Sequence, residues 1–278
     1  MEYNKNVLYG LSNRCYEHPF DRKALEMLEN KSFLTKACKW VTENTVEKLY
    51  TIQYTGSHLK ITKDSYPQIF EYLEYVCNIL GLKKIPDMYL RWDYDVNACT
   101  IGAEKPIIII NSGLIDLCTD DEILFVIGHE VGHILSNHML YHMLAQVINY
   151  VVDSVPGGHV LAGGIQYALY YWERMSEFTA DRAGLLGCQN IDAALGAFIK
   201  ISGLPKAHFD RINKDAFIQQ ARDFKLLDIE NMNKVFKIIS ISDSSHPWTI
   251  MRVAELLNWV DKGEYQDIVM HCTKNIEY

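Results

Sequence analysis

The sequence predicts an α+β fold that is mainly helical and contains one small β-sheet. Apolar residues recur at helical spacing among charged residues over 21–47 and again over 65–80. Two stretches are typical of strands instead: DMYLRW at 87–92 alternates in character, and IIII at 107–110 is wholly apolar. With 278 residues, of which 49% are hydrophobic, the chain can bury a full core as one unit or two closely packed subdomains.

Charge and cysteine content exclude several classes of protein. The formal net charge is -8 and no run of Lys and Arg occurs, so a nucleic-acid binder is not expected. The seven cysteines form an odd set without a C-x-x-C pair, which argues against a disulfide framework and against a thiolate zinc site. Because the first 26 residues mix charges and lack the apolar stretch of a secretory signal, we expect a cytoplasmic protein with reduced thiols.

Two uncharged runs are long enough to be candidate membrane spans, Val131 to Val152 and Ser154 to Trp172. The first contains several histidines and polar residues, and the second contains a proline and four glycines. We therefore expect no transmembrane segment, and peripheral membrane contact is not favoured.

The elements are expected in the following order. Residues 1–47 form an N-terminal helical segment, and 49–62 form a hairpin that turns at Thr55-Gly56-Ser57. A helix over 65–80 ends at Gly81. The mixed stretch Asn97 to Ile101 is placed at a sheet edge, and Ile107 to Ile110 is placed inside the sheet because a wholly apolar strand is covered on both faces.

Two long helices are expected to follow. After a short helix near Gly113 to Cys118, Thr119 and Glu122 form a capping box that opens the helix carrying HEVGH. A second helix is predicted from about Ile165 to Leu186, after the glycines of 154–164. We divide the chain into the N-terminal segment 1–47, a catalytic core 48–205, and a helical region 206–278 that completes the active site.

The motif HEVGH at 129–133 places two histidines four residues apart on a helix. At this spacing His129 and His133 are about 40° apart in projection and roughly 6 Å apart along the axis, so both can bind one zinc ion at about 2.0 to 2.1 Å. Glu130 leans toward the side where the attacking water would lie and can take its proton. The motif predicts a zinc-dependent hydrolase, and the alternative is an exposed histidine pair.

A catalytic zinc ion needs a third protein ligand and an open fourth position. A third histidine at the metzincin position would be residue 139, which is Met139. His138 stands nine residues after His129 and would project to the opposite side of a continuous helix, so it is only a second-best ligand. The third ligand is therefore expected from elsewhere in the chain.

The segment ERMSEFTADRAG offers Glu173, Glu177 and Asp181 at four-residue intervals on one helical face. We expect Glu177 to be the ligand, because Asp181 one turn later can then accept the Nδ1 proton of a zinc-bound histidine. Glu173 is interpreted as a solvated helix charge. The predicted site is one Zn²⁺ ion held by His129, His133 and Glu177, with Asp181 behind it.

Three motifs in this order, HEVGHILSNH, EFTADRAG and SHPWTIMR, resemble the M48 family of zinc metallopeptidases. The resemblance covers about residues 48–258. It implies a gluzincin fold, in which a small, mostly antiparallel sheet packs on the zinc-binding helix. It also implies cleavage of internal peptide bonds, with peptides or exposed protein segments lying along the sheet edge at Asn97, Ala98, Cys99 and Thr100. Many members are integral membrane enzymes, so a chain without spans indicates a soluble member.

A second donor to the oxyanion is expected from the last motif. His246, before Pro247, and Arg252, one turn after Trp248, are the candidates. Two other roles stay open for His246: a resting-state ligand at the fourth zinc position, or a local cap. The predicted function is a zinc-dependent endopeptidase. The alternatives are a zinc aminopeptidase and a chaperone-like or scaffold protein that retains a zinc site.

Overall fold

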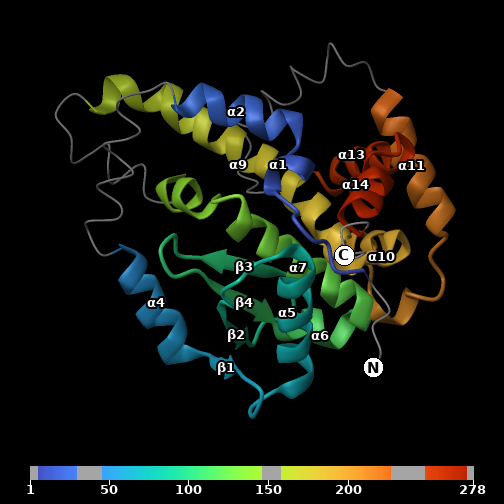
Figure 1. Ribbon diagram of the computed structural model, residues 1–278, viewed down its shortest axis with the longest axis horizontal. Helices are drawn as coiled ribbons and strands as arrows, with labels where there is room; N and C mark the ends of the chain where they lie inside the picture. The colour runs from blue at the N-terminus through green and yellow to red at the C-terminus, as the bar shows by residue number, and fades with distance from the viewer. Residues whose placement is uncertain (1–5, 30–45, 146–157, 227–247, 274–278) are drawn as a thin grey trace.

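The computed structural model describes residues 6–29, 46–145, 158–226 and 248–273. Helices surround one four-stranded sheet (Figure 1), which confirms the mainly helical α+β fold predicted from the sequence. Two strand pairs of the sheet are antiparallel and one is parallel. In spatial order the strands are β1 (Leu59–Ile61), β2 (Asp87–Arg91), β4 (Ile107–Asn111) and β3 (Ala98–Ile101). Strand β3 therefore lies at the predicted edge.

Strand β4 is buried on both faces, as its apolar sequence predicted. Ile108 and Ile110 belong to the main core, together with residues of α5 (Pro67–Leu80) and α7 (Asp120–Leu135). Ile107 and Ile109 belong to a small cluster on the opposite face, where Tyr54 packs against them. Tyr54 comes from α4 (Val46–Ser57), so helices cover both faces of the sheet.

The predicted hairpin at 49–62 is wrong. Residues 46–57 form helix α4, and only the end of the stretch becomes strand β1, which pairs with β2. Tyr54 packs under the sheet, and the hydroxyl of Thr55 donates to the carbonyl of Ile52 within the helix. Tertiary packing and this local hydrogen bond outweigh the alternating pattern, which for a short apolar run does not separate strand from helix.

The boundaries of the neighbouring elements agree better with the sequence. Helix α5 ends at Gly81, which adopts the left-handed conformation with φ of 77°. A short helix α6 (Ser112–Leu117) follows β4, and α7 opens with the predicted capping box of Thr119 and Glu122. Helix α9 (Gly158–Cys188) begins seven residues earlier than expected, so the glycines at 158–164 lie within the helix rather than in a loop.

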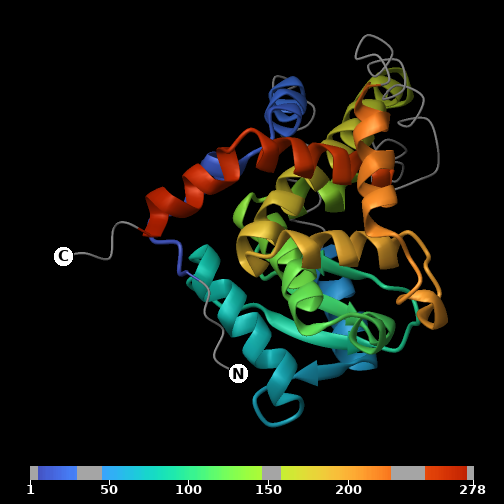
Figure 2. The same ribbon diagram turned by 90° about the vertical axis from the view of Figure 1, so that its right-hand side faces the viewer.

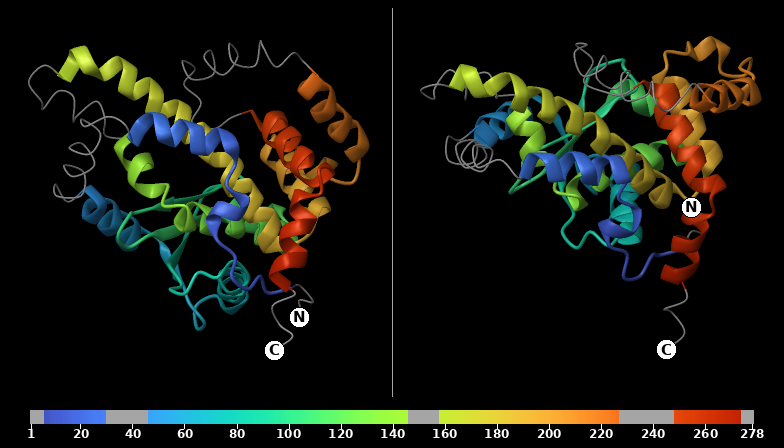
Figure 3. Two further views of the ribbon diagram at one scale, coloured as in Figure 1. Left: turned by 45° about the horizontal axis from the view of Figure 1, so that its top comes forward. Right: turned by 90° about the horizontal axis from the view of Figure 1, so that it is seen from above.

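The remaining helices enclose α7 and α9. The N-terminal helices α1 (Asn13–Tyr16) and α2 (Pro19–Glu29) contact α9, and Figure 3 shows α2 running beside it. On the C-terminal side are α10 (Ile191–Ile201), a 3-10 turn η1 (Lys206–His208), α11 (Lys214–Leu226), α13 (Thr249–Asp261) and α14 (Glu264–Thr273). Figure 2 shows this group on the side of α7 and α9 away from β1. No helix in the described ranges is long and apolar enough to cross a membrane.

Helices α7 and α9 cross at very short range because both carry glycine at the crossing. A Cβ atom added to Gly132 would lie 2.5 Å from the Cβ of Ala183, and one added to Gly184 would lie 2.8 Å from the carbonyl oxygen of Phe125. The small residues let the two backbones approach, so side chains from one turn of each helix can meet. The glycine inside HEVGH therefore has a packing role.

Replacing Gly132 by alanine should destabilise the protein. Overpacking of a close helix crossing typically costs about 1 to 3 kcal/mol, which corresponds to a melting temperature lower by roughly 2 to 4 °C per kcal/mol. Thermal unfolding of the metal-free protein measures the effect. Gly56→Ala is the matched control, because a Cβ at that helical position meets no atom within 4 Å. Equal melting temperatures for wild type and Gly132→Ala would contradict the packing argument.

Candidate metal centre and active site

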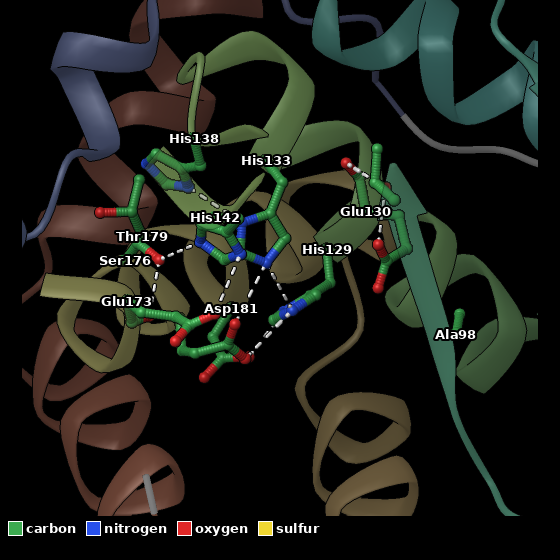
Figure 4. A network of polar contacts seen from close by, with 12 residues as sticks. Ala98, His129, Glu130, His133, His138, His142, Glu173, Ser176, Thr179 and Asp181 are labelled. Atoms are coloured by element: carbon green, nitrogen blue, oxygen red, sulfur yellow. Dashed lines mark hydrogen bonds and ion pairs between the residues drawn. The ribbon is translucent and has the colours of Figure 1, made fainter. Parts of the chain in front are cut away.

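Three buried donor groups from α7 and α9 face one another. The Nε2 atoms of His129 and His133 are 3.1 Å apart. The carboxylate of Glu177 approaches both, with Oε2 at 3.4 Å from the Nε2 of His129 and Oε1 at 3.3 Å from that of His133. Each of the three side chains is at least nine-tenths buried. Figure 4 shows both histidines directed toward the carboxylates of α9.

These separations fit a tetrahedral zinc ion. With bonds of about 2.0 to 2.1 Å, neighbouring ligand atoms in a tetrahedral site lie roughly 3.3 to 3.4 Å apart. Two imidazole nitrogens and one carboxylate are also the donor set of a catalytic zinc site that leaves the fourth position open. The three residues chosen from the sequence are therefore brought together in an arrangement that can hold one metal ion.

The carboxylate of Asp181 lies behind the donor set. Its Oδ1 is 3.0 Å from the Nδ1 of His129, and its Oδ2 accepts a hydrogen bond of 2.8 Å from the Nε of Arg252. The guanidinium of Arg252 also lies 3.4 Å from Glu177, and it packs on the ring of Phe198. Arg252 thus ties the carboxylates of two successive turns of α9 to helix α13.

The charges of this cluster shift the pKa of its members in opposite directions. Burial alone would lower the pKa of His129, but the carboxylates of Glu177 and Asp181 raise it to about 10. Burial lowers the pKa of His133 to about 4, although Glu177 opposes the shift. Burial would raise the pKa of Asp181, yet Arg252 holds it below its ordinary value. A metal ion that binds here must displace the proton that His129 would otherwise hold.

Glu130 lies beside the donor set and is held by the edge strand. The hydroxyl of Thr100 in β3 donates a hydrogen bond of 2.6 Å to the Oε2 of Glu130. Burial raises the pKa of Glu130 above the ordinary carboxyl value, while His129 and the Thr100 hydrogen bond act against the rise. A carboxyl group whose pKa is raised toward neutrality suits proton transfer.

An open cleft of about 530 Å³ reaches these groups. Its lining includes His129, Glu130 and Glu177, and also Asn97 and Ala98. Two of the four expected substrate-contacting residues therefore face the cleft. Figure 4 shows Ala98 on the strand that passes Glu130.

The other two expected substrate contacts, Cys99 and Thr100, do not line the cleft. The side chain of Cys99 packs on the opposite face of the sheet with Ile109, and Thr100 is engaged with Glu130. Because side chains alternate along β3, Cys99 lies on the face opposite to Ala98 and Thr100, and Thr100 shares the face of Glu130. Arg252 lines the cleft, but its guanidinium is bonded to carboxylates. His246 lies outside the described residues, together with Pro247.

The expected position of His138 on the far side of the zinc helix is wrong. Helix α7 ends at Leu135, and Asn137 adopts a left-handed conformation with φ of 55°. The turn brings His138 back, so that its Nδ1 lies 2.9 Å from the Nδ1 of His133. The projection from the sequence assumed a continuous helix. Glu173, interpreted as a solvated charge, is in fact largely buried beside His142.

The contacts of Thr100 with Glu130, and of His138 with Asp21, were not found from the sequence. Asp21 lies 117 residues from His138, and Thr100 lies 30 residues from Glu130. No local spacing connects such pairs. For the contact of Thr100 with Glu130, the one signal in the sequence was the predicted position of Thr100 at the sheet edge beside the zinc helix.

A histidine pair on one helix, a carboxylate on the next and a buried glutamate beside an open cleft together form the arrangement of a metal-dependent hydrolase. The comparison with known families is more specific, since the model of Peptidase family M48 matches residues 67–260. The chain therefore belongs to peptidase family M48, and its general activity is metal-dependent proteolysis, with zinc as the metal that the family implies.

Several curated proteins are similar over most of their length. The plastoglobule-localized metallopeptidase 48 of Arabidopsis thaliana chloroplasts is 27% identical over 93% of this chain and 76% of its own. Protease HtpX homolog 2 of Methanosarcina acetivorans is 24% identical, and its namesake in Methanosarcina mazei is 27% identical. Both alignments cover 73% of this chain and 75% of the relative. No solved structure matches the chain significantly.

Proposed function

We propose that the protein is a zinc endopeptidase that hydrolyses internal peptide bonds, with one Zn²⁺ held by His129, His133 and Glu177. The observation that carries the proposal is the position of strand β3. Within the described ranges β3 pairs only with β4, so its other edge is available beside the cleft that contains Glu130. An extended peptide can add to such an edge through main-chain hydrogen bonds and pass the site without using either terminus.

Zinc, when bound, polarises the scissile carbonyl and makes water a better nucleophile near neutral pH. In this proposal Glu130 takes the proton from the attacking water and passes it to the nitrogen of the leaving amine. The hydroxyl of Thr100 fixes the carboxylate of Glu130 by its 2.6 Å hydrogen bond. His246 stays the proposed second donor to the oxyanion.

Arg252 has two functions in the proposed site. Its bonds to Asp181 and its ion pair with Glu177 hold the carboxylates that face the histidines. Asp181 in turn accepts the Nδ1 proton of His129, which leaves Nε2 free to bind the metal. We propose that Arg252 supports the metal ligands and also presents positive charge to the cleft that it lines.

Replacing Thr100 by valine should lower kcat by roughly 10- to 100-fold, because a hydrogen bond to a charged group is typically worth about 1.5 to 3 kcal/mol and each 1.4 kcal/mol is tenfold. Steady-state kinetics and zinc content measure the effect, and both KM and zinc content should stay unchanged. Thr100→Ser keeps the hydroxyl and is the matched control. A valine variant with wild-type kcat would show that Glu130 does not depend on this contact.

Three peptides of one sequence separate the proposed function from its alternatives. One carries a blocked N-terminus, one a free N-terminus, and one is blocked at both ends. An endopeptidase cleaves all three at internal bonds, and mass spectrometry identifies those bonds. Sequential release of residues from the free N-terminus alone would indicate an aminopeptidase. Cleavage of none, with zinc bound, would indicate a scaffold protein.

We propose the cytoplasm as the compartment. Support comes from the cysteines at 15, 77, 99, 118, 188 and 272, all of which are free thiols, as in a reducing compartment. The relative from Arabidopsis is named for a chloroplast structure, which makes a plastid the other candidate. Fractionation of the source cells distinguishes the two.

A further inference from the structure

We propose that Asp21, in the N-terminal helix α2, orients the metal ligand His133 through His138. Both are positioning residues in this scheme, since neither touches the metal or the substrate. The inference rests on the proposed zinc site. It also gives a function to the N-terminal segment, because Asp21 lies outside residues 67–260 that match the family model.

An unbroken series of contacts joins the three residues. The Nδ1 atoms of His133 and His138 are 2.9 Å apart, and the Nε2 of His138 lies 3.2 Å from the Oδ2 of Asp21. All three residues are at least nineteen-twentieths buried. Figure 4 shows His138 directed at His133 from the side away from Glu130.

Metal binding fixes the direction of the hydrogen bonds. The Nε2 of His133 must present its lone pair to the ion, so the proton of this imidazole resides on Nδ1. The Nδ1 of His138 must then accept that proton, which places the proton of His138 on Nε2, where it is donated to Asp21. Only one arrangement of the histidine protons satisfies both contacts: each imidazole is neutral, and the Oδ2 of Asp21 accepts from the Nε2 of His138.

Asp21 is well suited to be the ionised end of the series. The hydroxyl of Thr179 donates a 2.6 Å hydrogen bond to its Oδ2. Although burial would raise the pKa of Asp21, its bonds to His138 and Thr179 hold that pKa below the ordinary value. Thr179 stands two residues after Glu177 on α9, so Asp21 contacts one helix that supplies a metal ligand and, through His138, the turn that follows the other.

The backbone places His138 for this contact. The left-handed turn at Asn137 reverses the chain, and the N–H of His138 donates to the carbonyl oxygen of His133 at 3.1 Å. The ring of His138 also packs edge-on against Trp172, with 5.5 Å between ring centroids. The imidazole is therefore held from the backbone side and from the ring side, and its rotation is restricted.

A second metal ion is the competing interpretation of the same histidines. Donor atoms of His133, His138 and His142 lie within 4.8 Å of one another, so they too could hold an ion. Such an ion would need the Nδ1 of His133 without its proton, while Nε2 binds the first metal. His142 already contacts Ser176 through Nε2 at 3.0 Å. The hydrogen-bonded series needs no deprotonated imidazole and accounts for Asp21, so we favour it.

Zinc affinity is the decisive measurement, and it does not depend on peptidase activity. The dissociation constant is obtained by competition with a chelating indicator, for the full chain and for His138→Ala, His138→Asn, Asp21→Asn and His142→Asn. Loss of an outer contact to a metal-bound histidine typically weakens metal binding by about 10- to 100-fold. We expect that loss for His138→Ala and for Asp21→Asn.

Matched variants separate positioning from a general structural effect. In His138→Asn the side-chain oxygen takes about the place of Nδ1 and can accept from His133, so most of the affinity should return. Adding Asp21→Asn to His138→Asn should then change the zinc affinity little, because the contact between residue 138 and Asp21 is already lost in His138→Asn. His142→Asn should bind zinc as the wild type does. If His138→Ala does not fold, as judged by melting of the metal-free protein, His138→Asn and Asp21→Asn still test the inference.

Several results would overturn the inference. These are an unchanged zinc affinity in both His138→Ala and Asp21→Asn, additive effects in the double variant, or two zinc ions per chain with one lost in His142→Asn. NMR of the zinc-bound protein provides an independent check, since His138 must be the Nε2–H tautomer. Failure of the wild type to bind zinc would instead contradict the proposed function itself.

Discussion

Replacing Glu130 by glutamine should abolish peptide hydrolysis while zinc stays bound. Glutamine has nearly the same shape, and its Oε1 can still accept the hydrogen bond from Thr100 that holds the side chain in place. It cannot take a proton from water. A positioned general acid or base contributes about 10² to 10⁴ in rate, so kcat should fall by at least a hundredfold.

Zinc analysis and the cleavage of a doubly blocked peptide are measured on the same preparation of this variant. Glu173→Gln is the matched control, since Glu173 is also a largely buried carboxyl group near the site but contacts His142 instead of the cleft. It should keep near-wild-type kcat. Loss of zinc from Glu130→Gln would mean that Glu130 is a ligand, and retained activity would mean that another group removes the proton.

Local spacing predicted the parts of the site that lie on one helix. His129 and His133 are one turn apart, and so are Glu177 and Asp181, because four residues make about one turn of any helix. The capping box at Thr119 and the glycine at the end of α5 are similarly local, since each depends on a few neighbouring residues. These features do not depend on how the helices pack.

Features that depend on packing were not predictable from a single sequence. The sequence of 49–62 is compatible with a hairpin turn and also with a helix. In the structure the helix is favoured, because it lets Tyr54 pack against the sheet. His138 was misplaced because the projection continued the helix past Asn137, although asparagine is one of the residues that commonly end a helix in the left-handed conformation. Asp21, His138 and Thr100 acquire partners only once α2, α7 and β3 have come together.

Glu177→Ala tests the choice of the third ligand, and it should weaken zinc binding by more than a hundredfold. Loss of a residue that only supports a metal ligand typically weakens metal binding by about 10- to 100-fold. Glu177 contacts both histidine Nε2 atoms directly, so its loss should weaken zinc binding by more than that. Each hundredfold loss of affinity removes about 2.7 kcal/mol of zinc-dependent stabilisation at a fixed zinc concentration. The rise in melting temperature on adding zinc should therefore shrink by roughly 5 to 10 °C.

Glu173→Ala is the matched control for this variant, because Glu173 precedes Glu177 by one turn on the same face of α9. Comparing the melting temperatures with and without zinc separates a lost ligand from a lost packing contact. A lost ligand lowers only the temperature measured with zinc, whereas a lost contact lowers both. If Glu173→Ala loses zinc and Glu177→Ala keeps it, the metal ion lies between Glu173 and His133, the second histidine of the motif. In that case the Asp181 contact with His129 at 3.0 Å would be a structural ion pair rather than a support for a ligand.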